Sequence, residues 1–280
     1  MVVFNKKDEL TPFIQNLKKE GKTIGFLPTM GALHEGHLSL AKLSIAQNDY
    51  TIVSIFVNPT QFNNPEDLEK YPRTEEKDIE LLTQNGVDFV YLPSVSDLYE
   101  EGEVAKKYNF GGIENVMEGE FRPGHFDGVA TIVSKLIRAV NPDRAYFGEK
   151  DFQQVRIVQE MVKQEQLPVE IVPVPIKRAE NGLALSSRNV RLSTENLEAA
   201  PFIYKVLQEA VSLKNEGKTP DEIKAFVQQT FDQSSFKLEY FEITDEETLQ
   251  TLESFREHQK ARGFVVAYAG DIRLIDNIQF

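Results

Sequence analysis

The feature that most constrains the fold is an alternation of short apolar runs with longer amphipathic ones along residues 1–180. The apolar runs have the β-branched and aromatic content of buried strands, and they are TIGFL (23–27), YTIVSIFV (50–57), VDFVYLP (87–93), RAYFG (144–148) and VEIVPVPI (169–176). The runs between them have helical spacing, at 37–49, 75–86, 127–140 and 151–164. This alternation predicts a doubly wound, Rossmann-like α/β domain with a parallel sheet covered on both faces. Ligands of such domains bind at the carboxyl ends of the strands.

The pattern changes after residue 180 and predicts a second, smaller domain. Helical spacing covers 193–217 and 219–232, and two β-like runs follow at 237–244 and 263–278. We therefore expect a nucleotide-binding domain at 1–180 and a smaller C-terminal α+β lid domain at 181–280.

Charge and cysteine content exclude several classes of function. The chain has 31 Lys and Arg against 44 Asp and Glu, a net charge of −13, so a broad nucleic-acid-binding face is not expected. Zero cysteines exclude disulfide scaffolds, thiolate nucleophiles and cysteine metal cages. The first twenty residues lack a signal-peptide pattern and no run resembles a membrane span, so we expect a soluble, cytoplasmic protein with no membrane partner.

The turn PTMGALHEGH (28–37) carries the clearest chemical signal. It joins a predicted strand to a predicted helix, where Gly31 and Gly36 allow a ligand to approach the backbone and the helix start favours phosphate oxygens. His34 and His37 are three residues apart, so both can donate to one phosphoryl group. Surface histidines at a helix cap are the alternative. A zinc site with His125 is another, although the HExxH motif requires histidines four residues apart.

Other polar residues follow predicted strands. Asn58, Gln61 and Asn63 lie in FVNPTQFNN, and their amides suit a hydroxyl or a carboxylate. Arg122 and His125 form a donor pair on a glycine-flanked loop. Ordinary Asn-Pro turn chemistry explains the three amides about equally well, and an ordinary exposed basic loop is the competing interpretation of Arg122 and His125.

Two later segments carry cations. In FGEKDFQQ, Lys150 is suited to a phosphate and Asp151 to a ribose hydroxyl, although an exposed helix start looks the same in sequence. In PIKRAENGLALSSRN (175–189), Ser186, Ser187 and Arg188 combine hydroxyls with a guanidinium suited to phosphate. A mobile loop there would bring the Arg188 guanidinium to the leaving pyrophosphate. The alternative interpretation is a flexible linker without a catalytic role.

Together these motifs resemble the pantothenate synthetase (pantoate–β-alanine ligase) family of the HIGH-motif nucleotidyltransferase superfamily. PTMGALHEGH, FVNPTQF, YPRT, RPGHFDGVATIVSKL, FGEKDFQQV and GLALSSRN occur in the family's order, and a weaker match reaches RLIDN. The resemblance implies that pantoate attacks the α-phosphate of ATP, pyrophosphate leaves with Mg²⁺, and β-alanine then attacks the pantoyl adenylate to give pantothenate and AMP. It also implies a homodimer.

The resemblance assigns roles to individual residues. It implies His37, His34, Lys150 and Arg188 as catalytic residues. The implied ATP contacts are Met30, Gly31, Ala32, Leu33, His34, Glu35, Gly36, His37, Gly148, Glu149, Lys150, Asp151, Lys177, Leu185, Ser186, Ser187 and Arg188. The implied substrate ligands are Gln61, Gln154, Asn58, Arg122 and His125, and Asp78 is the implied Mg²⁺ ligand.

The sequence departs from the family pattern in two places. Leu185 stands where methionine is common, a swap that nearly conserves volume. The segment after YPRT reads EEKD, with less aspartate than the family pattern, so only Asp78 carries the metal role. Another nucleotidyltransferase, a non-catalytic nucleotide-binding regulator and a histidine–metal hydrolase remain as alternatives.

Overall fold

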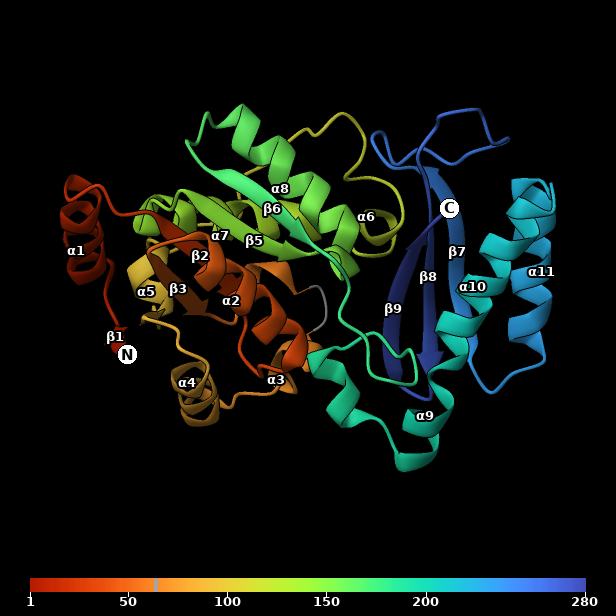
Figure 1. Ribbon diagram of the computed structural model, residues 1–280, viewed down its shortest axis with the longest axis horizontal. Helices are drawn as coiled ribbons and strands as arrows, with labels where there is room; N and C mark the ends of the chain where they lie inside the picture. The colour runs from red at the N-terminus through yellow and green to blue at the C-terminus, as the bar shows by residue number, and fades with distance from the viewer. Residues whose placement is uncertain (63–64) are drawn as a thin grey trace. The chain divides into compact units, whose positions relative to one another are not determined.

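The computed structural model describes residues 1–62 and 65–280, so Asn63 lies outside the described residues. The chain divides into two compact units (Figure 1). Unit 1 comprises residues 1–149 and 153–175, and unit 2 comprises residues 150–152 and 176–280. No helix within the described ranges has the length and apolar character needed to traverse a lipid bilayer.

Unit 1 is built on a parallel sheet with the strand order β1-β4-β3-β2-β5-β6. The strands are β1 (Val2–Phe4), β2 (Ile24–Thr29), β3 (Tyr50–Ile55), β4 (Phe89–Tyr91), β5 (Arg144–Gly148) and β6 (Glu170–Val174). The main helices are α1 (Lys7–Lys19), α2 (Glu35–Gln47), α4 (Glu75–Gln84), α7 (His125–Val140) and α8 (Phe152–Gln164). Shorter elements are η1 (Pro59–Gln61), α3 (Pro65–Glu69), α5 (Val95–Leu98) and α6 (Glu118–Phe121). The short helix η2 (Glu149–Asp151) begins in unit 1 and continues in unit 2, which also includes Phe152, the first residue of α8. The predicted doubly wound α/β fold is confirmed.

Strand order reverses at β2. From β2 the chain adds β3 and β4 on one side of the sheet, and later adds β5 and β6 on the other. In doubly wound sheets ligands bind at this switch point, outside the carboxyl ends of the two central strands. The histidine turn follows β2, and Gly148 ends β5. Both of these segments therefore begin at the sheet edge where a ligand is expected.

Unit 2 combines a three-stranded antiparallel sheet with helices on one face. The sheet has the order β7-β8-β9, with β7 (Lys237–Asp245), β8 (Ala261–Ala269) and β9 (Ile272–Gln279). Helices α10 (Phe202–Asn215) and α11 (Pro220–Asp232) lie along it, after η3 (Ser187–Arg191) and α9 (Thr194–Ala199) (Figure 1). Buried Val206, Leu207, Ile223, Val227 and Val265 form part of the shared core.

Two sequence-based element boundaries are wrong. The single helix expected over 193–217 is broken into α9 and α10 at Pro201, because proline has no N–H to continue the helical hydrogen bonds. The single β run expected over 263–278 is a hairpin. Gly270, with φ of 60°, turns the chain between β8 and β9.

A largely buried carboxylate joins several segments of unit 1. Glu165 follows α8 and accepts hydrogen bonds from Lys106 Nζ at 2.8 Å, Tyr108 Oη at 2.6 Å and Arg138 Nη2 at 2.9 Å, and from the Ser134 hydroxyl. Burial opposes ionisation, but these four donors outweigh it and lower the pKa of Glu165 to about 2.

The Glu165→Gln variant is expected to be less stable than the wild type at neutral pH by about 3 kcal/mol, the value of a pKa lowered from 4.5 to about 2. A lowered folded-state pKa gives stability that is complete above the unfolded pKa. The difference in unfolding free energy should therefore be constant above about pH 4.5 and shrink as the pH falls toward 2. Urea titrations at several pH values measure this difference.

Glu170→Gln, which breaks an exposed pair with Arg144, is the control and should change stability by less than about 1 kcal/mol. An equal difference for the two variants at neutral pH contradicts the assignment.

Candidate active site

The histidine turn caps helix α2 with both of its imidazoles. His34 is the N-cap residue, and its Nδ1 accepts a hydrogen bond from the Gly36 amide at 3.0 Å. His37 Nδ1 accepts from the His34 amide at 3.3 Å, which closes a reciprocal capping box. The ring centroids are 4.2 Å apart. The prediction that these two side chains lie together is confirmed.

Capping also orients the protons of both rings. An imidazole Nδ1 that accepts a backbone N–H carries a lone pair, so the proton of the neutral ring is on Nε2. Nε2 of His34 and of His37 is therefore the hydrogen-bond donor of each ring. The same arrangement satisfies two amides at the start of α2 and presents two N–H donors suited to a phosphoryl group. The capping role offered as an alternative to function is thus also present, and the two are compatible.

Asp78 holds the backbone before the histidines in place. Gly31 and Ala32 both have positive φ, 78° and 49°, which is uncommon for alanine. Asp78 Oδ2 accepts from the Ala32 amide at 2.9 Å, and Oδ1 accepts from the Leu33 amide at 2.8 Å. Asp78 is 2% exposed. Asp78 lies in helix α4, and its carboxylate therefore stabilises the strained turn at Gly31 and Ala32. The sequence did not indicate this role.

The Asp78 carboxylate, implied as a magnesium ligand, already accepts hydrogen bonds from the protein. Within residues 1–62 and 65–280, no group of three or more His, Asp or Glu side chains is placed to hold a metal ion. Both oxygens of Asp78 receive hydrogen bonds from the turn, with a further bond to Oδ2 from the Thr74 hydroxyl at 3.2 Å. The assignment of Asp78 to Mg²⁺ therefore remains a prediction, and we derive no step from it.

Gln61 lies in a buried amide network at the end of β3. Asn58 Nδ2 donates to Gln61 Oε1 at 3.2 Å, and Gln61 Nε2 lies 3.0 Å from Met30 Sδ in the histidine turn. Tyr99 Oη donates to Asn58 Oδ1 at 2.9 Å. Desolvation raises the pKa of Tyr99, so its hydroxyl keeps the proton that it donates. Tyr99 therefore orients Asn58, and Asn58 orients Gln61. No sequence motif pointed to Tyr99.

Arg122 and His125 fix the backbone of Gln61. His125 Nδ1 lies 2.8 Å from the Gln61 carbonyl oxygen and donates to it, and Arg122 Nη2 donates to that oxygen at 3.4 Å. Arg122 Nη1 lies 3.2 Å from His125 Nε2. The pair predicted to bind an oxyanion is thus together, and it holds a carbonyl of the protein. Gly128 lets α7 approach η1 closely, because a Cβ at this position would lie 2.5 Å from the Thr60 carbonyl oxygen.

The residues after β5 divide into supporting and exposed groups. Gln153 Nε2 donates to the Ile113 and Val116 carbonyls at 2.8 and 2.7 Å, so this glutamine supports the fold. Gln154 lies in α8 with a half-buried side chain, and within the described residues that side chain has no hydrogen-bond partner. A Cβ on Gly148 would meet open space. Gln154 and the backbone at Gly148 are therefore available to a ligand.

In unit 2 the structure brings Lys150 together with the serine segment. Lys150 and Ser186 line one small cavity with Asn189, Tyr204 and Asp276. Lys150 is 17% exposed, and its Nζ lies 3.8 Å from Asp151 Oδ1.

The serine segment follows a hairpin. In this hairpin Leu185 N donates to the Lys177 carbonyl at 3.0 Å. Ser186 Oγ then caps η3 by accepting from the Arg188 amide at 3.2 Å. Lys177 is exposed, and Leu185, Ser187 and Arg188 are half-buried.

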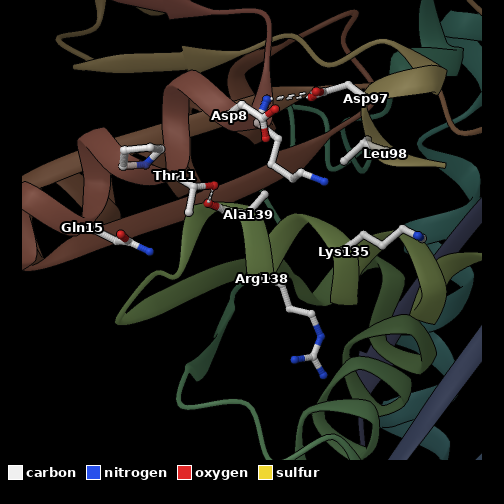
Figure 2. Close-up of a pocket in the computed structure, with 10 residues that line it drawn as sticks. Asp8, Thr11, Gln15, Asp97, Leu98, Lys135, Arg138 and Ala139 are labelled. Carbon is white, nitrogen blue, oxygen red and sulfur yellow. Dashed lines mark hydrogen bonds between the residues drawn. The ribbon is translucent and has the colours of Figure 1, made fainter. Parts of the chain in front are cut away.

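A separate hollow of about 550 Å³ in unit 1 contains none of the predicted site residues (Figure 2). It lies among α1, α5 and α7, where the Thr11 hydroxyl donates to the Ala139 carbonyl at 2.9 Å. Two of its cations are already paired, Lys135 with Glu103 at 2.7 Å and Arg138 with Glu165 at 2.9 Å.

The sequence profile described as pantoate-beta-alanine ligase matches residues 2–279. The chain belongs to the pantoate–β-alanine ligase family. Curated relatives named pantothenate synthetase include one from Flavobacterium psychrophilum, 50% identical over 99% of both chains, and one from Porphyromonas gingivalis, 46% identical over 100% of this chain and 99% of the relative.

Solved structures of this family share the fold. Pantothenate synthetase from Thermus thermophilus is 40% identical, with a TM-score of 0.91 over 99% of both chains. The ligase from Francisella tularensis, complexed with beta-gamma ATP and beta-alanine, is 37% identical, with a TM-score of 0.82 over 99% of this chain and 97% of that one. The family resemblance inferred from the motifs is confirmed.

Proposed function

We infer that this chain catalyses the ATP-dependent condensation of (R)-pantoate with β-alanine to pantothenate, through a pantoyl adenylate, with release of AMP and pyrophosphate. The family match over residues 2–279 carries this conclusion. The capped histidine turn at the switch point of the sheet supports it, because adenylate formation requires donors at an α-phosphate.

Each cluster takes a role in this proposal. The Nε2–H groups of His34 and His37 donate to the α-phosphate as the pantoate carboxylate attacks it. Lys150, with Ser186 to Arg188, stabilises the charge that develops on the departing pyrophosphate. Gln61 and Gln154 bind the hydroxyl and carboxylate of pantoate. The chain contains no cysteine, and this chemistry needs no covalent enzyme intermediate, since the adenylate is itself the activated acyl donor.

Further parts of the proposal come from the family resemblance. We propose that Mg²⁺ arrives with the triphosphate of ATP, because Mg²⁺ is usually bound through substrate phosphates and only one or two protein carboxylates. We also propose a homodimer, a cytoplasmic location, and a division of labour between a binding domain at 1–180 and a lid domain at 181–280. Gel filtration with light scattering tests the homodimer.

The test of the reaction is substrate omission with identification of the products by mass. Complete turnover should require ATP, pantoate and β-alanine, and should yield pantothenate and AMP in equal amounts. Pyrophosphate release with a different acid or a phosphate ester, but not with pantoate, would keep the nucleotidyltransferase fold and reject this substrate.

The Gln61→Ala variant is expected to raise the KM for pantoate about tenfold to a hundredfold, the value of a lost hydrogen bond to a charged group. The KM for ATP should change much less, because Gln61 belongs to the acid-binding network. Steady-state kinetics with each substrate varied in turn measures both constants. Gln84→Ala, on an exposed part of α4, is the matched control. A larger effect on ATP than on pantoate would contradict the assignment.

A further inference from the structure

Strand β9 carries two adjacent buried polar residues, Asp276 and Asn277, which are 5% and 1% exposed. Successive side chains of a strand point to opposite faces of the sheet. Asp276 pairs with Val265 and shares the face that α10 and α11 cover, whereas Asn277 pairs with Phe264 and points to the other face. The pair therefore reaches both sides of the sheet from one position in the chain.

On the helix face, Asp276 holds the hairpin that leads to the serine segment. Arg178 Nη1 and Nη2 donate to the two Asp276 oxygens at 2.6 and 2.8 Å, a bidentate pair. The same guanidinium donates to the Gly182 carbonyl at 3.1 Å and lies 3.7 Å from the centre of the Tyr204 ring. Arg178 follows Lys177 and forms an isolated antiparallel β-bridge with Ala184. Fixing Arg178 therefore fixes the hairpin that runs from Arg178 to Ala184.

On the opposite face, Asn277 holds the turn that carries Lys150. Its Nδ2 donates to the Lys150 carbonyl at 2.9 Å, and its Oδ1 accepts from Arg262 Nη1 at 2.7 Å. The Arg262 guanidinium lies 4.0 Å from the centre of the Phe152 ring, which pins the same turn from its other end. A short amide is suited to this position because it provides one donor and one acceptor.

We propose that Asn277 is a positioning residue for adenylate formation, which acts by holding the Lys150 turn, and that Asp276 does the same for the Ser186–Arg188 segment. The proposal rests on the proposed function. One dipeptide of β9 thus aligns two phosphate-binding segments that are far apart in the sequence. Displacing a catalytic group by about 1 Å costs on the order of a hundredfold in rate, so the alignment of Lys150 has a measurable value.

The test uses Asn277→Ala and Asn277→Asp in the full chain. The aspartate keeps an acceptor for Arg262 but replaces the donor to the Lys150 carbonyl by an oxygen. Single-turnover pyrophosphate release from ATP and pantoate should slow about tenfold to a hundredfold in both variants, with the KM for ATP within about threefold of the wild type. Attack of β-alanine on preformed pantoyl adenylate should keep its rate. Circular dichroism and thermal unfolding confirm that the measured protein is folded.

A double variant separates positioning from general destabilisation. If Asn277 acts through Lys150, then Lys150→Ala with Asn277→Ala should be no slower than Lys150→Ala alone. Glu239→Ala is the control. It removes the partner of Arg273 and Tyr268 in the same sheet, so it should lower stability and leave the rate unchanged.

Single variants at wild-type rate would overturn the proposal, as would a double variant slowed by the product of the two single effects. A wild-type chain that releases no pyrophosphate would instead reject the proposed function.

Discussion

Replacing His37 by alanine is expected to slow adenylate formation by about 10²- to 10³-fold, the usual effect of removing one donor aimed at developing charge. The capping geometry fixes the ring so that Nε2–H is the donor. The loss should be in kcat, with a small change in the KM for pantoate, because the donor acts on the phosphoryl group. Rapid-quench measurement of pyrophosphate release, without β-alanine, gives the rate of this step.

Loss of the helix cap must be separated from loss of the donor, since His37 serves both roles. The chain offers a matched control at helix α11, where Thr219 and Glu222 form a second capping box. Glu222→Ala removes the equivalent cap in unit 2 and should cost about 1 kcal/mol of stability without slowing the reaction. A folded His37→Ala variant that turns over at a near-normal rate would remove His37 from the mechanism.

Replacing Lys150 by alanine is expected to slow adenylate formation by a comparable 10²- to 10³-fold, or about 3 to 4 kcal/mol in the activation barrier. The Nζ charge compensates the leaving pyrophosphate, which is absent from the second half-reaction. Attack of β-alanine on preformed pantoyl adenylate should therefore be affected far less. Comparing the two half-reactions in one variant separates this charge effect from a general loss of active enzyme.

Lys163→Ala is the control for removing a positive charge, because Lys163 lies exposed on α8 and pairs only with Glu160 among the described residues. It should change neither half-reaction. Asp151→Asn removes the carboxylate 3.8 Å from Lys150 Nζ and tests whether Lys150 serves mainly that ion pair. If Asp151→Asn slowed adenylate formation as much as Lys150→Ala while the KM for ATP stayed unchanged, the ion pair would explain the effect and the phosphate role of Lys150 would be rejected, because loss of an ATP contact by Asp151 would raise that KM.

The central part of the fold was predictable because its strands are buried. The runs at 23–27, 50–57 and 144–148 are nearly continuous in apolar residues, and each becomes a strand of the parallel sheet. The N-terminal β1 and α1 were not predicted. β1 is a three-residue edge strand, and α1 contains Pro12, which weakens the helical signal.

The candidate site was predictable only where a motif is local in sequence. His34 and His37 lie together because three-residue spacing at a helix start imposes it. Asp78 supports Ala32 from 46 residues away, and Tyr99 reaches Asn58 across 41 residues. Such contacts depend on the tertiary fold, so spacing along the chain carries no signal of them. The same is true of Asn277 and Lys150, which are 127 residues apart.

The most direct test of the account follows the oxygen of the substrate. Pantoate labelled with ¹⁸O at both carboxylate oxygens should be turned over with ATP and β-alanine. The products should then be separated, and the ¹⁸O content of each should be measured by mass spectrometry. Attack of the carboxylate on the α-phosphate transfers one of its oxygens to AMP, so the account predicts AMP carrying a single ¹⁸O and unlabelled pyrophosphate. Unlabelled AMP with ¹⁸O in pyrophosphate or phosphate would contradict it, because the acid would then be activated at another phosphorus.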